Sequence, residues 1–316
     1  MSTTPQSLDG PLVSVIMPCR DGMPFVGSAV RRVLAQEVPL ELLFVDAGST
    51  DGSLQEVTSI DDDRIRVIEA PPGTQPGPAR NLAARQARGE VLAFADADDL
   101  WRRDKLARQL RLRSVTGAAL VYSDCRVIDR EGRLLGMYLS RHRPVEGTVT
   151  DRLLEENFVP LSTVIVDRKA FECAGAFQAG FRVACDYLFM IRLSRLAAFA
   201  FDPDSLVDYR IHGRNVTADF RTTYAENVRV LDLLLADGAA SLGDARLRRA
   251  RSLVHWKWAI RELIAGPGSW ARARSQARGA LRSGGTTMAL STLAAAIRGG
   301  FRGLPLRVRM ARARAA

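Results

Sequence analysis

Apolar runs alternate with helical apolar periodicities along the first part of the chain. Short, β-branched apolar runs predict strands at 12–17, 40–45, 64–70, 90–95 and 118–124. Apolar residues that recur every three or four positions predict helices at 24–36, 76–90 and 100–113. Pro18 is expected to end the first strand. Because strands that alternate with such helices form βαβ units, the pattern predicts an α/β fold with a mostly parallel sheet.

Further along the chain the signals for strands and helices no longer alternate regularly, and the last part of the chain shows helical signals alone. A hairpin turn is predicted at 130–132, strands at 162–167 and 206–212, and a helix at 186–197. Two apolar stripes follow, Leu253, Trp256, Ile260 and Leu263, then Leu290, Leu293, Ile297 and Phe301. We therefore expect a flexible N-terminus at 1–11, one domain at 12–221 and a helical, arginine-rich C-terminal extension at 222–316.

The positive charge of the chain lies almost entirely in its C-terminal part. From Glu226 onwards there are 17 basic against 5 acidic residues, whereas residues 1–225 carry 28 against 30, which together give the net charge of +10. Ten arginines and no acidic residue follow Glu262. An enzyme that acts on nucleic acid usually carries its positive charge on the surface that contacts the nucleic acid. The nearly neutral charge of residues 1–225 therefore argues against nucleic acid as a partner. The division of charge suits a catalytic body that binds an anionic membrane surface through its tail, although the tail could also pack on the body or mediate assembly.

Other general features favour a cytoplasmic protein, located as a peripheral protein at the inner face of the cell membrane if the tail binds lipid. No apolar run approaches the length of about 18 residues that a spanning helix needs. The first residues lack the basic and apolar pattern of a secretory signal. The four cysteines are scattered without CxxC spacing, which indicates reduced thiols and no zinc site.

An acidic cluster follows the strand predicted at 90–95. The stretch LAFADADDLW (92–101) places Asp96, Asp98 and Asp99 directly after apolar residues. Carboxylates at i and i+2 can turn towards one point, where their hard oxygens can hold Mg²⁺ or Mn²⁺. The alternative is that Asp98 or Asp99 caps a helix that begins at Leu100, and we expect Asp99 to be that cap even if the other two bind metal.

Two further polar residues are expected near this cluster. Asp46 ends a buried strand and could accept a hydrogen bond from a ligand, or simply belong to a turn rich in Asp, Gly and Ser. Arg80, in GPARN (77–81), lies on the first turn of a helix and would otherwise be a solvated surface arginine. A dinucleotide site is not expected, because no GxGxxG follows the first strand.

Five motifs in this order resemble those of one enzyme family. VSVIMPCRDG, FVDAGSTDGS, GPARNLA, GEVLAFADADD and AGAFQAGFRVACDYLFMIRLS are similar to motifs of the nucleotide-sugar-dependent glycosyltransferases of family 2. The resemblance covers residues 12–215. It implies a GT-A fold, which is Rossmann-like with helices flanking the sheet, divided into a nucleotide-sugar-binding half (12–125) and an acceptor half (126–221).

The resemblance also implies roles for individual residues. Asp46 matches the acid that recognises the nucleotide base, with Pro18 in the loop against it, and Arg80 matches the motif arginine near the nucleotide. Asp96 and Asp98 match the outer residues of the DXD motif, which carries a divalent metal, Mn²⁺ or Mg²⁺, on the diphosphate.

Two more residues match the acceptor side of the family. Asp186 matches the catalytic base of inverting members, although it could instead be a helix N-cap. His212, in YRIHGRN, resembles a histidine that helps to hold the metal, but a histidine before such a loop is often only structural. His142 and His255 are given no functional role.

Departures from the family pattern affect specificity more than chemistry. Ala47 replaces a frequent second acid, Cys185 replaces the Glu of the family's ED motif, Arg20 and Asp21 replace a frequent Tyr-Asn pair, and Ala83 replaces a Gly. These changes leave the sugar and the base open and remove no reacting group.

The sequence therefore predicts an inverting, metal-dependent glycosyltransferase. The donor would be a UDP-, dTDP- or GDP-sugar and the acceptor a glycan or a lipid-linked saccharide, in bacterial surface polysaccharide synthesis. The alternatives are a polyprenyl-phosphate sugar synthase of the same fold, a nucleotidyltransferase, and a non-catalytic nucleotide-binding scaffold.

Overall fold

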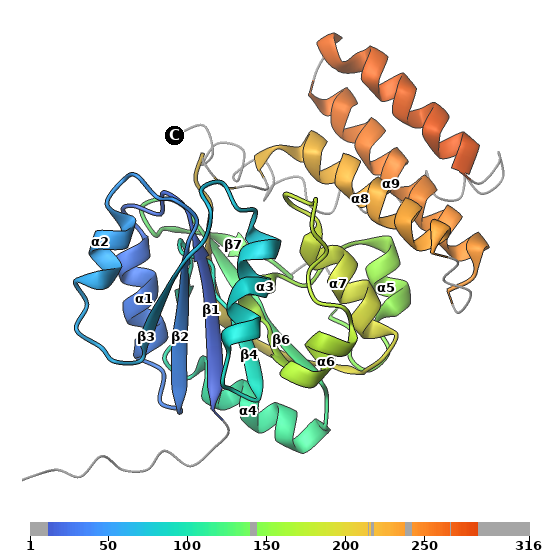
Figure 1. The fold of residues 1–316 in the computed structure, drawn as a ribbon. Coiled ribbons are helices and arrows are strands. Elements are labelled where there is room, and N and C mark those ends of the chain that lie inside the picture. The colour runs from blue at the N-terminus through green and yellow to red at the C-terminus, as the bar shows by residue number, and fades with distance from the viewer. Residues whose placement is uncertain are drawn as a thin grey trace, which may run out of the picture. The chain divides into compact units, whose positions relative to one another are not determined.

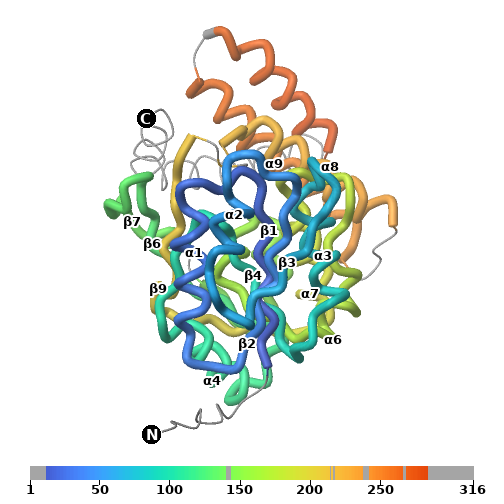
Figure 2. Tube along the Cα trace, turned by 60° about the vertical axis from the view of Figure 1, so that its left-hand side comes forward, coloured from blue at the N-terminus to red at the C-terminus, as the bar shows by residue number. Residues whose placement is uncertain are grey.

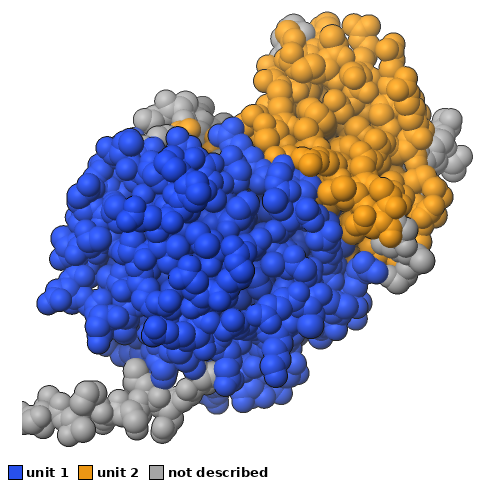
Figure 3. Space-filling model, viewed as in Figure 1, with its two compact units in different colours: residues 1–149, 158–211 blue, residues 150–157, 212–316 orange. Residues whose placement is uncertain are grey.

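The protein is described by a computed structural model that places residues 12–139, 144–213, 215, 218–237, 242–265 and 267–283. Its contacts divide the chain into two compact units (Figure 3). The sheet unit comprises residues 1–149 and 158–211, and the helical unit comprises 150–157 and 212–316. The sequence predicts a boundary between the domain and the C-terminal extension at 221/222. This boundary remains a prediction.

A single nine-stranded sheet forms the centre of the sheet unit (Figure 1). Its strand order is β3-β2-β1-β4-β8-β6-β9-β5, with β7 paired to β6. The pairs β3-β2, β2-β1, β1-β4 and β6-β9 are parallel and the others are antiparallel. The strands are β1 Val13–Cys19, β2 Leu40–Asp46, β3 Ile65–Glu69, β4 Val91–Phe94, β5 Leu100–Trp101, β6 Leu120–Ile128, β7 Leu134–Met137, β8 Ile165–Asp167 and β9 Phe199–Arg210. The α/β class and the hairpin at 130–132 are confirmed.

Helices cover both faces of this sheet because alternate strand residues are buried on opposite sides. On one face Val15 and Met17 pack with Val26 and Val30 of α1. On the other face Phe94 contacts the rings of Phe171 and Phe177. Figure 2 shows α1 on one side of the strands and α3 and α7 on the other. The helices of this unit are α1 Val26–Leu34, α2 Ser53–Thr58, α3 Pro76–Gln86, α4 Lys105–Thr116, α6 Arg168–Cys173 and α7 Cys185–Ser194, with the short 3-10 helix η1 Leu161–Thr163.

The first strand continues past the proline that was expected to end it. Pro18 lies inside β1, opposite Val45 of β2, and the strand runs to Cys19. On its other side β1 pairs with β4 only as far as Ile16. Since Pro18 is past the two-sided part of the ladder, its missing N–H group leaves no sheet hydrogen bond broken.

The segment after the acidic cluster is also different from the prediction. Leu100 and Trp101 form the short strand β5, which pairs antiparallel with Val207 and Asp208 of β9. The following helix α4 begins only at Lys105. The prediction of a helix from residue 100 is therefore wrong, because pairing with a distant strand outweighs the local helical periodicity.

The helical unit consists of α5 Thr150–Glu155, α8 Phe220–Ala236, α9 Asp244–Ile264, the 3-10 helix η3 Pro267–Ser269 and a helix at 270–283. Its residue Leu253 is buried as predicted, but Leu263 of the same stripe is 55% exposed. The stripe from Leu290 to Phe301 lies outside the described residues. Within the described part of the chain, no helix is both long enough and apolar enough to cross a membrane.

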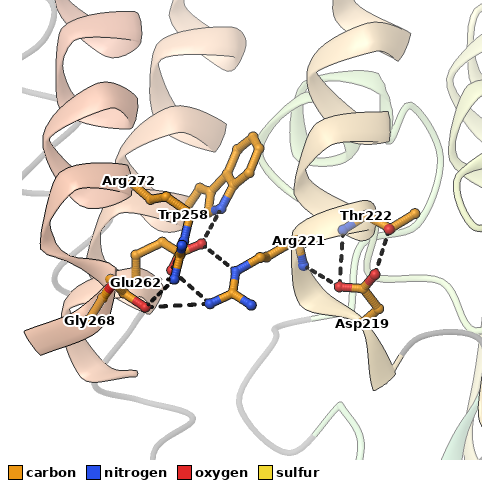
Figure 4. A network of polar contacts seen from close by, with 8 residues as sticks. Asp219, Arg221, Thr222, Trp258, Glu262, Gly268 and Arg272 are labelled. Carbon is orange, nitrogen blue, oxygen red and sulfur yellow. Dashed lines mark hydrogen bonds and ion pairs between the residues drawn. The ribbon is translucent and has the colours of Figure 1, made fainter. Parts of the chain in front are cut away.

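A buried carboxylate joins three segments of the helical unit (Figure 4). Glu262 of α9 has no exposed side-chain surface, and its oxygens accept hydrogen bonds from Arg221 at 2.9 and 3.2 Å. Arg272 and the Trp258 indole also donate to it, each at 3.2 Å. The network ties the start of α8 to the end of α9 and to the helix at 270–283.

Candidate active site

The ends of three neighbouring strands bring the predicted site residues to one edge of the sheet. In the parallel ladder Cys19 of β1 lies opposite Asp46 of β2. The Ala95 amide donates to the carbonyl of Ile16 at 3.0 Å, so the chain stays beside β1 as it approaches Asp96. Asp46 and Asp96 therefore lie at the carboxyl edge, where α/β sheets bind their ligands.

Asp46 is a buried acceptor with one oxygen unused. Its side chain is 5% exposed, and its Oδ2 accepts from the amides of Gly48 and Ser49, both at 3.1 Å. Gly48 has a φ of +81° and lies close to Pro72, so a larger residue would be strained there. The turn thus fixes the carboxylate, while the buried Oδ1 has no hydrogen-bond partner within the described residues. A turn alone would not leave this atom unsatisfied, so the carboxylate is suited to accept from a ligand.

The loops after β1 and β2 are joined by side-chain hydrogen bonds. Asp21 Oδ1 accepts from the Thr50 amide at 2.8 Å, and Ser49 Oγ accepts from the Asp21 amide at 3.0 Å. The remaining links run from the Gly22 amide to Ser53 Oγ at 2.9 Å and from the Met23 amide to Asp51 Oδ2 at 2.8 Å. This cross-linking holds one rim of the candidate site rigid beside Asp46.

Arg80 is a buried arginine and not a solvated one. It is 7% exposed, and its Nη2 donates to Asp96 Oδ1 at 2.6 Å. Its guanidinium carbon lies 5.9 Å from the ring centroid of Phe177. The buried Nε has no partner within the described residues. The pair places α3 against the acidic cluster and leaves one donor for a ligand.

Asp99 does not cap a helix, contrary to the expectation. The N-cap of α4 is Asp104, and Asp99 is 2% exposed. Its Oδ1 accepts from the backbone amide of Arg210 at 2.9 Å. The reason is again β5, since pairing with β9 brings Arg210 to the carboxylate.

The charge of Asp98 destabilises the charged forms of its buried neighbours Asp96 and Asp99. Burial raises the pKa of the Asp96 carboxyl, Arg80 opposes this rise, and Asp98 adds to it. Burial raises the pKa of Asp99 well above its ordinary value, and the charges of Asp98 and Asp96 add to the effect. A cation at this edge of the sheet would relieve the repulsion.

The outer two carboxylates fit a divalent cation that is shared with a ligand. Asp98 is partly exposed, and Asp96 Oδ2 has no hydrogen-bond partner in the described part of the chain. No group of three or more metal-ligating side chains occurs among the described residues. Mg²⁺ and Mn²⁺ are commonly held by one or two carboxylates together with phosphate oxygens. Two aspartates at this position therefore suit a metal that arrives with a diphosphate.

Asp186 lies on the first turn of α7 and is not its N-cap. The cap position is Ala184, and Asp186 Oδ1 accepts from the Tyr187 amide at 2.7 Å. Helix α3 contacts both the loop that leads to α7 and the start of α7 itself. Asn81 exchanges hydrogen bonds with the carbonyl and amide of Phe177, at 2.7 and 3.0 Å. A Cβ on Gly77 would lie only 3.3 Å from the Cys185 sulfur, so glycine permits this close approach.

Two predicted site residues keep their roles as predictions. Pro18 is partly exposed near the end of β1, within a strand and not in a loop. His212 is 8% exposed and belongs to the helical unit, where its amide donates to Asn215 Oδ1 at 2.5 Å. His255 is buried and bonds Gln276 through Nδ1 in the helical unit, and His142 lies outside the described residues.

Sequence reasoning overlooked two residues that the structure connects to these groups. Asn81 was quoted within GPARN but given no role. Arg210 is a buried charge inside the strand pattern LVDYRIH. A permanently charged residue at an inward position of a strand is the signal that could have identified it.

Comparison with known proteins matches this chain to glycosyltransferases. The model of glycosyl transferase family 2 matches residues 14–189, which is more than half of the chain. The chain is 34% identical to TuaG of Bacillus subtilis, named as a teichuronic acid biosynthesis glycosyltransferase, over 50% of this chain and 63% of TuaG. It is 27% identical to the Escherichia coli UDP-Glc:alpha-D-GlcNAc-diphosphoundecaprenol beta-1,3-glucosyltransferase WfgD, over 51% of this chain and 62% of WfgD. The matches thus span less than two thirds of these relatives.

Solved structures share the fold at lower sequence identity. Residues 1–349 of Staphylococcus aureus TarS, in complex with UDP-GlcNAc, align with a TM-score of 0.68 and 18% identity over 96% of this chain and 89% of that one. The mannosyltransferase PcManGT of Pyrobaculum calidifontis, in complex with GDP-Man and Mn²⁺, aligns with a TM-score of 0.61 and 21% identity over 96% and 86%. The sheet is therefore of the GT-A type. With the family match over residues 14–189, this chain belongs to glycosyltransferase family 2.

Proposed function

We propose that this protein is a metal-dependent, inverting glycosyltransferase that uses a nucleotide-diphosphate sugar. The observation that carries the proposal is the arrangement of the carboxyl edge: Arg80 pairs with Asp96 at 2.6 Å, two residues before Asp98. Beside them Asp46 keeps an unsatisfied buried oxygen. A site built from an acceptor, a buried guanidinium and paired carboxylates suits a nucleotide diphosphate.

Each of these groups has a task in binding the donor. Asp46 Oδ1 would accept from the base, and Pro18 would lie beside it. Asp96 and Asp98 would hold the divalent cation, Mn²⁺ or Mg²⁺. When bound, the cation stabilises the negative charge that develops on the departing diphosphate. Arg80 holds Asp96 in a fixed orientation towards that position.

The transfer step needs a base on the acceptor side. An acceptor hydroxyl attacks the anomeric carbon as the bond from that carbon to the diphosphate oxygen breaks, and Asp186 takes the hydroxyl proton. Direct attack from the opposite side inverts the configuration at this carbon. The contacts of Asn81 and Gly77 support this role, since they fix the start of α7 beside the helix that orients Asp96.

The acceptor class and the cellular setting are inferred from named relatives. TuaG is named for teichuronic acid biosynthesis, and the name of WfgD contains a lipid-linked acceptor. We extend these settings to this chain as the transfer of a sugar to a glycan or a lipid-linked saccharide in bacterial surface polysaccharide synthesis. A polyprenyl-phosphate sugar synthase of the same fold would use a simpler lipid phosphate as acceptor.

An exposed face of the helical unit supports location at an anionic membrane surface. On the helix at 270–283, Trp270 and Leu281 are 54% and 42% exposed. Arg274, Arg278 and Arg282 are also exposed, and helical spacing places all five residues on one side. No acidic residue follows Glu262 in the chain. Aromatic and aliphatic side chains interleaved with arginines fit the headgroup region of a cytoplasmic leaflet.

Nucleotide binding gives the first test of the proposed function. We expect one of UDP, dTDP and GDP to raise the melting temperature in the presence of Mn²⁺ and not in EDTA. A ligand at a hundred times its dissociation constant stabilises by about 2.7 kcal/mol, which corresponds to a shift of several degrees. Failure of every nucleotide to stabilise the protein would contradict the proposal.

Asp186→Asn then separates an enzyme from a scaffold. The variant keeps the shape of the side chain but cannot take a proton, so transfer should fall at least about a hundredfold while nucleotide binding is retained. A variant that transfers sugar as well as the wild type would remove Asp186 from the mechanism. Product NMR checks the stereochemistry, and a retained anomeric configuration would exclude direct displacement.

A further inference from the structure

The acidic cluster depends on a second buried arginine at the end of β9. Arg210 is 6% exposed, so its guanidinium group is almost entirely removed from solvent. The antiparallel register of β5 and β9 pairs Leu100 with Asp208. Continued by two residues, this register places Arg210 opposite Asp98. The side chain therefore emerges at the acidic cluster as a consequence of strand pairing.

The contacts of Arg210 converge on the backbone of the cluster. Its Nε donates to the Asp98 carbonyl at 3.0 Å, and its backbone amide donates to Asp99 Oδ1 at 2.9 Å. Its Nη1 donates to the carbonyls of Asp129 and Arg130, at 3.2 and 2.9 Å. These last two residues form the turn between β6 and β7.

The guanidinium group of Arg210 also lies over an aromatic ring. Its central carbon lies 4.7 Å from the ring centroid of Phe25, at the start of α1. One planar group thus joins the acidic loop, the β6–β7 turn and α1. Such a group can be placed in only one orientation, and it fixes the peptide that carries the Asp98 side chain.

We propose that Arg210 is a positioning residue that aims Asp98 at the metal–diphosphate site. The proposal rests on the function proposed above, in which Asp98 is a metal ligand. Arg210 acts through the Asp98 carbonyl, which its side chain binds, and through the Asp99 carboxylate, which its backbone amide binds. Without it, Asp98 would have to be ordered by the cation, and a higher concentration of Mn²⁺ would be needed to achieve the same binding.

Arg210→Lys tests this role because it keeps the charge and removes the planar fork. An ammonium group cannot reach the Asp98 carbonyl and the turn carbonyls in the same geometry. We expect the Mn²⁺ concentration for half-maximal stabilisation by UDP to rise about tenfold, the effect of losing a charge-assisted hydrogen bond. GDP replaces UDP if only GDP stabilises the wild type. At saturating Mn²⁺ the affinity for the nucleotide should stay within about twofold of the wild type, because Asp46 and Arg80 are untouched.

Arg126→Lys is the matched control. Arg126 lies on β6, the strand that pairs with β9, and binds Asp208 through two hydrogen bonds at 2.6 and 2.7 Å. It is about half exposed, so the same substitution should leave the Mn²⁺ requirement unchanged. An equal rise in both variants would indicate a general loosening of β9 and overturn the role of Arg210.

The remaining outcomes also decide the question. An unchanged Mn²⁺ requirement in a folded Arg210→Lys protein overturns the proposal. If that variant does not fold, Phe25→Leu replaces it, since it removes the aromatic face and keeps apolar bulk at a residue that is 8% exposed. A rise of about threefold then supports the proposal, and no rise overturns it. If the wild type itself shows no metal-dependent binding, the proposed function fails first, which is a distinguishable result.

Discussion

At the scale of single residues, the carboxyl edge of the sheet contains charged groups that stability alone does not explain. Asp46, Arg80, Asp99 and Arg210 are between 2% and 7% exposed. Burying a charge is costly even when it is paired, and replacing a buried pair by apolar residues often stabilises a protein. Two of these residues also keep a buried polar atom without a partner in the described part of the chain, namely Asp46 and Arg80. Such atoms are suited to meet a ligand.

Glu262 shows the opposite case, a buried carboxylate with a purely structural role. Hydrogen bonds from Arg221 lower its pKa from 4.5 to about 2, against the effect of burial. We expect Glu262→Gln to destabilise the protein by about 2 kcal/mol at pH 7, because the acceptor of these hydrogen bonds would lose its negative charge. Denaturant unfolding of both proteins measures this difference.

The pH dependence of this loss follows from the lowered pKa. The stabilisation by Glu262 is full above the unfolded value of 4.5 and disappears as the pH falls towards the folded value of about 2. The difference between wild type and Glu262→Gln should therefore shrink from about pH 5 downwards. Asp244→Asn is the control on the same helix, since its exposed pair with Arg248 contributes only about 0.5 kcal/mol. A constant difference between pH 7 and pH 3 would contradict the assignment.

At the scale of elements, the sequence predicts those strands and helices that form because of a pattern of neighbouring residues. Strands β1, β2, β3 and β4 and helices α1 and α3 were all predicted from apolar runs and helical spacing. Strand β5 was missed because only two residues form it, and its partner β9 begins almost a hundred positions later. The same distance hid the contact between Asp99 and Arg210, so a helix cap was predicted in its place.

Helix α3 connects both parts of the candidate site and provides a test at this scale. Asn81→Ala removes both hydrogen bonds to Phe177, so the loop that leads to Asp186 loses its tie to α3. We expect kcat for sugar transfer to fall between about tenfold and a hundredfold, as for a displaced reacting group. Nucleotide affinity should change little, because Arg80 and Asp96 keep their pair. The exposed Gln86 lies at the far end of α3, and Gln86→Ala should retain full activity. Parallel losses of affinity and kcat would instead show that α3 itself is displaced.

At the scale of the whole molecule, the sequence predicts the residues of the candidate site better than it predicts the contacts that hold these residues in place. Asp46, Arg80 and Asp96 stand at a strand end or a helix start, and the resemblance to the family motifs gave them their predicted roles. Their placement at one edge follows from the parallel order of β2, β1 and β4. The tie from Asn81 to Phe177 joins positions almost a hundred residues apart, which no local pattern encodes.

The division of charge between the parts of the chain has a consequence for location. Residues 1–225 carry a net charge of −2, and the remaining residues carry +12. We expect the full chain to sediment with vesicles of anionic phospholipid at low salt and to be released at about 0.5 M salt, where charges are screened within a few ångströms.

The exposed face of the helix at 270–283 makes this prediction specific. Replacing Arg274, Arg278 and Arg282 together by Gln should weaken vesicle binding by about a hundredfold, since each basic residue contributes about 1 kcal/mol near an anionic surface. The matched control replaces Arg31, Arg103 and Arg133, which are 60–75% exposed on the sheet unit and paired with acids, and it should bind as the wild type does. Equal weakening by both triple variants would indicate attraction by net charge alone. Absence of sedimentation at low salt would instead assign these arginines to packing or assembly, and the sugar acceptor would have to reach the site from solution.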